Sequence, residues 1–182
     1  RYHAVVQTGA RSDTEKSYVA ECAAQANWLV KSLDQRARTI LKVTSEIVRQ
    51  QDAFLAFGVE FLRPLNLKTV ADAIGMHEST VSRVTSNKYL STPRGVFELK
   101  FFFTAAIQST DGASSHSAEA VRHRIKTMID AEGADGDVLS DDRIVEILKE
   151  AGIDIARRTV AKYREALRIP SSVERRRLLR TG

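Results

Sequence analysis

The feature that most restricts the fold of this chain is a long stretch near its start without a helix breaker. Residues 10–57, between Gly9 and Gly58, contain neither glycine nor proline. Apolar side chains recur there at steps of three and four, the spacing of one face of an α-helix. An unbroken helix over this stretch would be roughly 70 Å long at ~1.5 Å per residue, too long for a small domain to cover. The stretch therefore predicts a helix that spans between modules or lies on a partner, with two helices broken near Asp34 as the alternative. The periodic positions are Val19, Ala23, Ala26, Val30, Leu33, Ile40, Val43, Ile47 and Phe54.

The composition favours an all-α protein with one or two small cores. Of the 182 residues, 43% are hydrophobic, and the chain has three prolines, nine glycines and few β-branched runs. No stretch approaches the ~18 apolar residues of a membrane span, and no secretory signal is expected. Cys22 is the single cysteine, so we expect no disulfide within the chain and a reducing, cytoplasmic setting.

A helix-turn-helix pattern occupies Leu67–Asn87. With Gly75 as the turn residue, Ala71 lies where the two helices cross and Val81 becomes the packing residue of the second helix. A generic helical hairpin is the alternative. The side chains left facing outward have types that suit phosphate and groove contacts: His77, Glu78, Ser79, Ser82 and Arg83.

The residues that follow are expected to form a linker and a second module. Lys88–Leu90 could form a short wing, and the polar, apolar-poor segment Gln108–Ser117 predicts a flexible linker. Ser140 is a good N-cap residue, and Gly152 ends the helix that Ser140 begins. With Gly152 as its turn residue, Val160 lies two places later than Val81 lies after Gly75, so the second helix-turn-helix has a longer turn than the first. The three helices of the last domain are expected at Ser117–Ala131, Ser140–Ala151 and Ala156–Leu167.

The third of these helices has a packing stripe and a basic side. At 100° per residue, Val160 and Tyr163 fall on one stripe, while Arg158, Lys162 and Glu165 point the opposite way. A helix of this kind can lie in a DNA major groove, where arginine binds guanine O6 and N7 with two hydrogen bonds. The outward side chains are flanked on one side by Arg157, Arg164 and Arg168.

The basic character of the chain is local. Residues 156–182 hold eight arginines and one lysine against two glutamates, a net charge of +7, whereas the whole chain carries +5. The preceding residues therefore sum to −2, and the positive charge is concentrated as in a nucleic-acid footprint. For Arg175–Arg177 alone, a solvated tail is an equally good interpretation.

Enzymatic interpretations fit poorly, so no cofactor or metal is expected. His77 and Glu78 begin a zinc-protease motif, but its second histidine would stand at Val81. Tyr163 might suggest a recombinase nucleophile, although its place on the packing stripe favours a core role. The pair Asp141-Asp142 is better explained as a helix N-terminus than as a metal site.

Five segments, in this order along the chain, resemble the motifs of the sigma-54 family of alternative bacterial sigma factors. The most specific of them is the run of ten residues ARRTVAKYRE, which resembles the signature box of that family. They are WLVKSL at 28–33 with Arg36, HESTVSRV at 77–84, KYL at 88–90, PRGVFELK at 93–100 and ARRTVAKYRE at 156–165.

The resemblance implies sequence-specific promoter recognition by two helices. The box helix would read the GG of the −24 element, chiefly through Arg158 and Lys162, and the earlier module would read the GC of the −12 element through Ser82 and Arg83. The offset of ~12 bp is a little over one turn of DNA and keeps both readers on nearly one face. The full set implied for the −24 element is Arg157, Arg158, Thr159, Lys162, Tyr163, Arg164 and Arg168. The set for the −12 element is His77, Glu78, Ser79, Ser82 and Arg83.

The resemblance also implies partners and a regulatory residue. The partners would be double-stranded promoter DNA, the β and β′ subunits of core RNA polymerase, and an AAA+ activator that opens the closed complex. Arg36, midway along the long helix, is expected to act in regulation, with an ordinary helix-surface charge as the alternative. A bipartite helix-turn-helix repressor that acts without polymerase is the competing function.

The domain organisation expected from these features is that of a C-terminal fragment. Its parts are the tail of a core-binding domain at 1–27, a long spanning helix at 28–63, a helix-turn-helix module at 64–107, a linker at 108–117 and a promoter-binding domain at 118–182.

Overall fold

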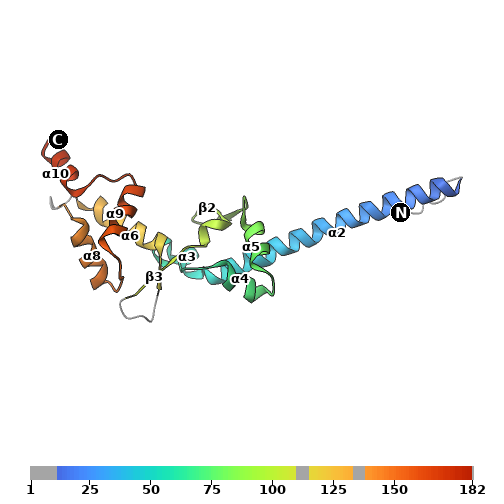
Figure 1. The fold of residues 1–182 in the computed structure, drawn as a ribbon, viewed down its shortest axis with the longest axis horizontal. Helices are drawn as coiled ribbons and strands as arrows, with labels where there is room; N and C mark the ends of the chain where they lie inside the picture. Colours follow the sequence, from blue (N-terminus) through green and yellow to red (C-terminus); the bar gives the residue numbers. More distant parts are fainter. Residues whose placement is uncertain (1–11, 110–114, 133–137, 182) are drawn as a thin grey trace. The chain divides into compact units, whose positions relative to one another are not determined.

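The computed structural model describes residues 12–109, 115–132 and 138–181 (Figure 1). Two compact units are distinguished, with the boundary between Lys42 and Val43. Helices dominate, as predicted, but the all-α expectation is wrong in detail. Two small antiparallel sheets of two strands each are present among the described residues. No helix in this part of the chain has the length and apolar content that a membrane span requires.

The long helix is continuous. Helix α2 runs through Asp13–Gln50 without a break at Asp34, so the prediction of one helix there is confirmed. It starts well before residue 28, so residues 13–27, predicted as the tail of a core-binding domain, are helical and continuous with the spanning helix. Residues 1–11 lie outside the described part. It also ends earlier than expected, because Gln51 interrupts it.

Gln51 begins a compact elbow. Its buried side chain donates from Nε2 to the Arg63 carbonyl at 2.8 Å and accepts at Oε1 from the Arg63 N–H at 3.0 Å. These bonds fold the chain back after α2. The elbow holds the short helix α3 (Asp52–Phe57) and the 3-10 helix η1 (Val59–Phe61).

The predicted helix-turn-helix is confirmed. Helices α4 (Leu67–Ile74) and α5 (Glu78–Thr85) are joined at Gly75, whose φ of 66° is the left-handed value that a turn glycine supplies. Ala71 and Val81 are buried between them, as expected. The first core of the second unit is Val43, Ile47, Phe54, Leu62, Leu65, Val70, Ala71, Val81, Leu99 and Phe102.

The predicted wing is present as a hairpin of β1 (Tyr89–Thr92) and β2 (Gly95–Glu98), followed by the 3-10 helix η2 (Leu99–Phe102). Tyr89 pairs with Glu98 and Thr92 with Gly95 in antiparallel register. The wing is held to the elbow, because the Arg94 guanidinium donates to the carbonyls of Leu55 and Ala56 at the end of α3.

The expected linker is partly structured. Strands β3 (Ala106–Gln108) and β4 (Ser115–Ser117) pair antiparallel, and Ser109 bridges to Ile153. The flexible-linker prediction is therefore wrong at both ends of Gln108–Ser117, because these polar residues satisfy their backbone groups in a hairpin. Residues 110–114 lie outside the described part.

Among its described residues, the last domain has the three predicted helices and a further one at its end. Helix α6 covers Ala118–Asp130, α8 covers Asp141–Glu150 and α9 covers Arg157–Ala166. Ser140 caps α8 as predicted, since its hydroxyl accepts from the Arg143 N–H at 3.1 Å. The additional helix α10 (Ser172–Thr181) replaces the solvated tail considered for Arg175–Arg177. The core of this domain is Val121, Ile125, Ile129, Ile144, Leu148, Ile153, Ile155, Val160 and Tyr163.

Candidate nucleic-acid interface

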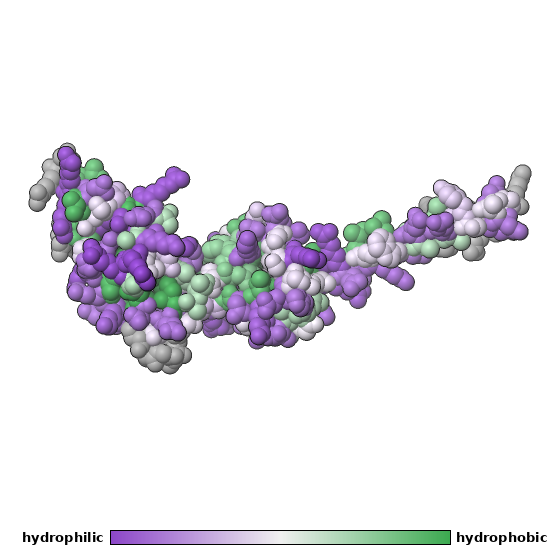
Figure 2. Space-filling view, in the orientation of Figure 1, coloured by the Kyte–Doolittle hydropathy of each residue, from purple (hydrophilic) through white to green (hydrophobic). Residues whose placement is uncertain are grey.

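Helix α9 exposes most of its predicted basic side. Val160 and Tyr163 are buried against α6 and α8, whereas Arg158 and Lys162 are exposed. Figure 2 shows hydrophilic side chains spread over the surface of these C-terminal helices. Arg157 is also exposed, and its Nε lies 3.2 Å from the Asp142 carboxylate. An exposed pair of this kind contributes ~0–1 kcal/mol, so Asp142 orients Arg157 without preventing a phosphate contact.

Arg164 and Tyr163, two residues of the predicted −24 set, have buried side chains. The Arg164 side chain is 7% exposed and forms a bidentate pair with Asp141, at 3.0 and 3.3 Å. It lies only 40° from Val160 on the helix, so its side chain faces the interior of the domain. Tyr163 is buried too, with the Arg122 guanidinium 4.8 Å above its ring, so its side chain serves packing. Thr159 is half-buried at the edge of the exposed side.

Helix α5 exposes the side chains predicted for the −12 element. Glu78, Ser82 and Arg83 are exposed, whereas Val81 is buried. His77 and Ser79 also form the N-terminal cap of α5. The His77 Nδ1 accepts from the Ser79 N–H at 3.2 Å and lies 2.8 Å from the Ser79 hydroxyl, which caps the first turn of α5. Arg83 has no ion pair within the described residues, so its guanidinium is available to a ligand.

Helix α10 is a packed element and not a tail. The Arg175 side chain is 10% exposed and forms a bidentate pair with the buried Glu132, at 2.8 and 3.0 Å. Ser171 and Glu174 form a reciprocal capping box, in which each side chain accepts from the backbone N–H of the other. The S-x-x-E spacing after Pro170 is a helix-start signal that sequence reasoning had passed over. Of the Arg175–Arg177 group, Arg175 is therefore structural.

Arg36 lies on the exposed surface of α2. Its guanidinium has no ion pair among residues 12–109, whereas Arg38, two positions on, pairs with Asp34 at 2.9 Å. Arg36 stands two turns before Val43 and three turns before Ile47, so all three share a helix face. That face is buried at Val43 and Ile47.

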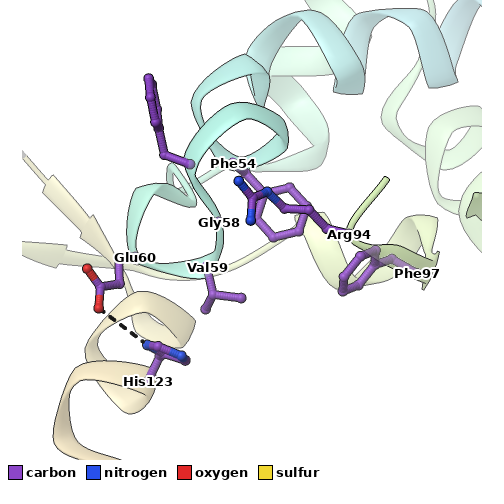
Figure 3. A pocket seen from close by; sticks show the side chains of 8 residues that line it. Phe54, Gly58, Val59, Glu60, Arg94, Phe97 and His123 are labelled. Carbon is purple, nitrogen blue, oxygen red and sulfur yellow. Dashed lines mark ion pairs between the residues drawn. The ribbon is translucent and has the colours of Figure 1, made fainter. Parts of the chain in front are cut away.

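The helix-turn-helix module and the C-terminal helices meet at the elbow. The 3-10 helix η1 packs against α6, and the His123 Nδ1 lies 3.7 Å from the Glu60 carboxylate across this contact (Figure 3). A cavity of about 500 Å³ beside the pair is also lined by Arg94, Phe97 and residues of α3. No group of three metal-ligating side chains is found in the portions of the chain described above.

The profile described as "Sigma-54, DNA binding domain" matches residues 16–177. The chain belongs to the sigma-54 DNA-binding domain family. It is a DNA-binding domain of a transcription factor and not an enzyme. The sigma-54 resemblance of the sequence motifs is thereby confirmed.

Relatives of this sigma-54 domain extend over most of its length. It is 79% identical over 180 residues to the RNA polymerase sigma-54 factor of Caulobacter vibrioides, covering 99% of this chain and 36% of that protein. The RNA polymerase sigma-54 factor of Azorhizobium caulinodans is 72% identical, with coverage of 97% and 34%. The chain thus spans about a third of the length of these curated relatives. A crystal structure of Aquifex aeolicus sigmaN bound to promoter DNA shares 38% identity and a TM-score of 0.59, covering 97% of this chain and 52% of that one.

Proposed function

We propose that this chain binds promoter DNA through two readers, α9 at the GG of a −24 element and α5 at the GC of a −12 element. The observation that carries the proposal is the outward basic side of α9, where Arg158 and Lys162 are exposed while Val160 and Tyr163 hold the opposite side in the core. Arginine can then pair with guanine O6 and N7 without disturbing the fold. Ser82 and Arg83 offer the corresponding contacts on α5.

Binding isotherms on three duplexes test this proposal. One duplex carries both elements, one has the GG replaced and one has the GC replaced. Each replacement removes one module's base contacts, so affinity should fall by roughly tenfold or more in each case. Equal affinity for all three duplexes would reduce the chain to a non-specific DNA binder.

The whole protein is proposed to be a sigma-54-type initiation factor. It would recruit core RNA polymerase through the β and β′ subunits into a closed complex, in the cytoplasm and at the nucleoid, until an AAA+ activator opens it. In this scheme the present chain supplies the position on the promoter. Relatives carrying the name RNA polymerase sigma-54 factor support the assignment.

A bipartite repressor remains the second candidate, because two DNA-reading helices would serve it equally well. Footprinting of one promoter with and without core polymerase separates the two. A sigma factor should extend its protected region when polymerase is added, whereas a repressor should give the same footprint in both samples. The experiment requires the full-length protein.

Arg36 is proposed as a regulatory residue that holds the closed state. Its support is its position: a cation without an ion pair in the described chain, on the helix face that continues to the buried Val43 and Ile47. A guanidinium there can hold carboxylate or carbonyl acceptors of an inhibitory segment and stand beside DNA phosphates. We expect Arg36→Ala in the full-length protein to permit some activator-independent transcription on pre-opened DNA, with closed-promoter binding and helix content unchanged. Run-off transcription without activator measures it, and a mutant as silent as wild type would leave Arg36 an ordinary surface charge.

A further inference from the structure

Helices α4, α8 and α9 end with the same pair of backbone hydrogen bonds. In each, the N–H of one residue after the helix donates three residues back, and the next N–H donates five residues back. The first of these two residues has a left-handed backbone in all three cases. It is Gly75 after α4, Gly152 after α8 and Arg168 after α9, with φ of 66°, 83° and 58°.

Arginine is an unfavourable residue in this position. A side chain at positive φ brings Cβ against the backbone, which glycine avoids and which asparagine tolerates better than most residues. The other positive-φ residues in the described part of the chain are glycines and Asn87. A residue with a long cationic side chain at such a point leaves the backbone strained, and backbone strain of this kind is found at functional sites.

Two buried guanidiniums hold the turn that contains Arg168. The Arg164 Nη1 donates to the Ile169 carbonyl at 2.9 Å, and the Arg175 Nη1 donates to the carbonyl of Pro170. The backbone carbonyls of the two residues that follow Arg168 therefore each accept a hydrogen bond from a buried arginine. Neither arginine is available for DNA, because both side chains are buried.

The same two arginines also bind the start of α8 and the segment just before it. Arg164 pairs with Asp141, and Arg175 donates from Nη2 to the Leu139 carbonyl at 2.8 Å. Glu132 completes the arrangement, since its Oε1 accepts from the Leu139 N–H at 3.0 Å while the carboxylate pairs with Arg175. The carboxylate pairs anchor both guanidiniums, so the turn after α9 cannot relax without losing the hydrogen bonds from Arg164 and Arg175 to the Ile169 and Pro170 carbonyls. These bonds hold the backbone at Arg168.

We propose that Arg168 is a fixed phosphate contact beside the reading side of α9, and that Arg164 and Arg175 are positioning residues that hold it there. The Arg168 side chain is exposed and has no hydrogen-bond or ion-pair partner among the described residues. A guanidinium binds phosphate oxygens with two parallel bonds, and phosphate contacts fix the register of a reading helix on the duplex. The inference rests on the proposed promoter binding.

Replacing Arg168 by glycine separates stability from DNA binding. Arg168→Gly removes the backbone strain and should raise the melting temperature. It should also weaken promoter binding about fivefold at ~0.15 M salt and reduce the slope of log K against log salt by ~0.9, as expected for one phosphate contact. Arg168→Ala should weaken binding equally while melting below the glycine variant. A glycine variant that binds with wild-type affinity and salt slope would overturn the proposal.

Neutral phosphates locate the contact and test the positioning role. Single methylphosphonates are placed in turn around the −24 GG, and one should weaken the wild type by about fivefold but leave Arg168→Gly unaffected. Arg175→Lys keeps the charge but loses the bidentate pairing, so the effect of that phosphate should shrink although Arg168 is intact. Retention of the full phosphate effect in a folded Arg175→Lys protein would refute the positioning role.

Two controls keep the outcome decisive. If Arg175→Lys is unfolded at the assay temperature, Glu132→Gln tests the same pair from its other side. Lys149→Ala is the surface control, because Lys149 is exposed on α8 and its side chain has no hydrogen-bond or ion-pair partner among the described residues, and any loss it causes should map to another phosphate. A wild-type chain that fails to prefer promoter DNA would reject the proposed function itself, which the glycine comparison does not do.

Discussion

Arginines of α9 serve opposite purposes according to the side of the helix they occupy. Arg158 is exposed, whereas Arg164, six residues later, is buried against Asp141. The hydrogen bonds that Arg164 donates to the Asp141 carboxylate raise the pKa of its guanidinium, which favours the charged form. The exposed arginine proposed for recognition and the buried arginine that pairs within the domain are therefore different side chains of one helix.

Arg158→Ala should cost ~1–3 kcal/mol in binding to a duplex with the −24 GG, because a bidentate guanine contact is lost. Preference for GG over a substituted duplex should flatten. Isotherms with both duplexes measure the change. The assignment is wrong if the loss is as large on the substituted duplex as on the native one.

Arg164→Ala should instead lower the free energy of unfolding, by roughly 3–5 kcal/mol, because the Asp141 carboxylate would be left without its partner. Chemical denaturation of the free protein measures this, with Arg158→Ala as the control that should unfold like wild type. An Arg164→Ala protein of unchanged stability that bound DNA poorly would restore Arg164 to the recognition surface.

At the scale of elements, α10 turns a basic tail into part of the promoter-binding domain. Its start is fixed by the capping box of Ser171 and Glu174, and its second turn by the pair of Arg175 with Glu132. Beyond Arg175, the Arg176 side chain is exposed, and its Nη2 donates to the Val138 carbonyl at 3.2 Å.

The capping box makes α10 sensitive to acid. Hydrogen bonds from the Ser171 backbone and hydroxyl lower the pKa of Glu174 from its ordinary value of 4.5. A lowered carboxyl pKa contributes stability that is present above about pH 4.5 and lost as the pH falls through the lowered value. Amide exchange in α10 should therefore accelerate on acidification more than in Glu174→Gln, which keeps a capping side chain without the titration. Identical acid profiles in the two proteins would contradict this.

At the scale of the whole molecule, the two readers are parts of one compact unit. The contact of η1 with α6 and the pair of Glu60 with His123 lie between the modules, beside the β3–β4 hairpin. The modules should therefore reinforce one another only on DNA of matching geometry.

Insertion of ~5 bp, about half a turn, between the two DNA elements should lower affinity sharply, toward that of one module alone. Titration of native and spaced duplexes measures it, and a spacer of ~10 bp shows whether helical phase or distance matters. Unchanged affinity on the half-turn spacer would mean that a single module binds DNA in this chain.

The sequence by itself determined the features that depend on neighbouring residues. Periodicity predicted the uninterrupted α2, Gly75 and Val81 predicted the first helix-turn-helix, and Ser140 predicted the start of α8, because helix faces, turns and caps are set within a few positions. The outward placement of Arg158 followed from the same local geometry, and the sigma-54 motifs are equally local.

Only the tertiary structure decided which arginine side chains are buried in ion pairs and which stay exposed to a ligand. Arg164 finds its carboxylate 23 residues away and Arg175 finds its own 43 residues away. No local pattern predicts such pairs, because they depend on how α6, α8 and α9 pack. The elbow at Gln51, the hairpin that replaced a linker and the left-handed Arg168 were fixed in the same way, since long-range contacts settled where each backbone and side-chain group found its partner.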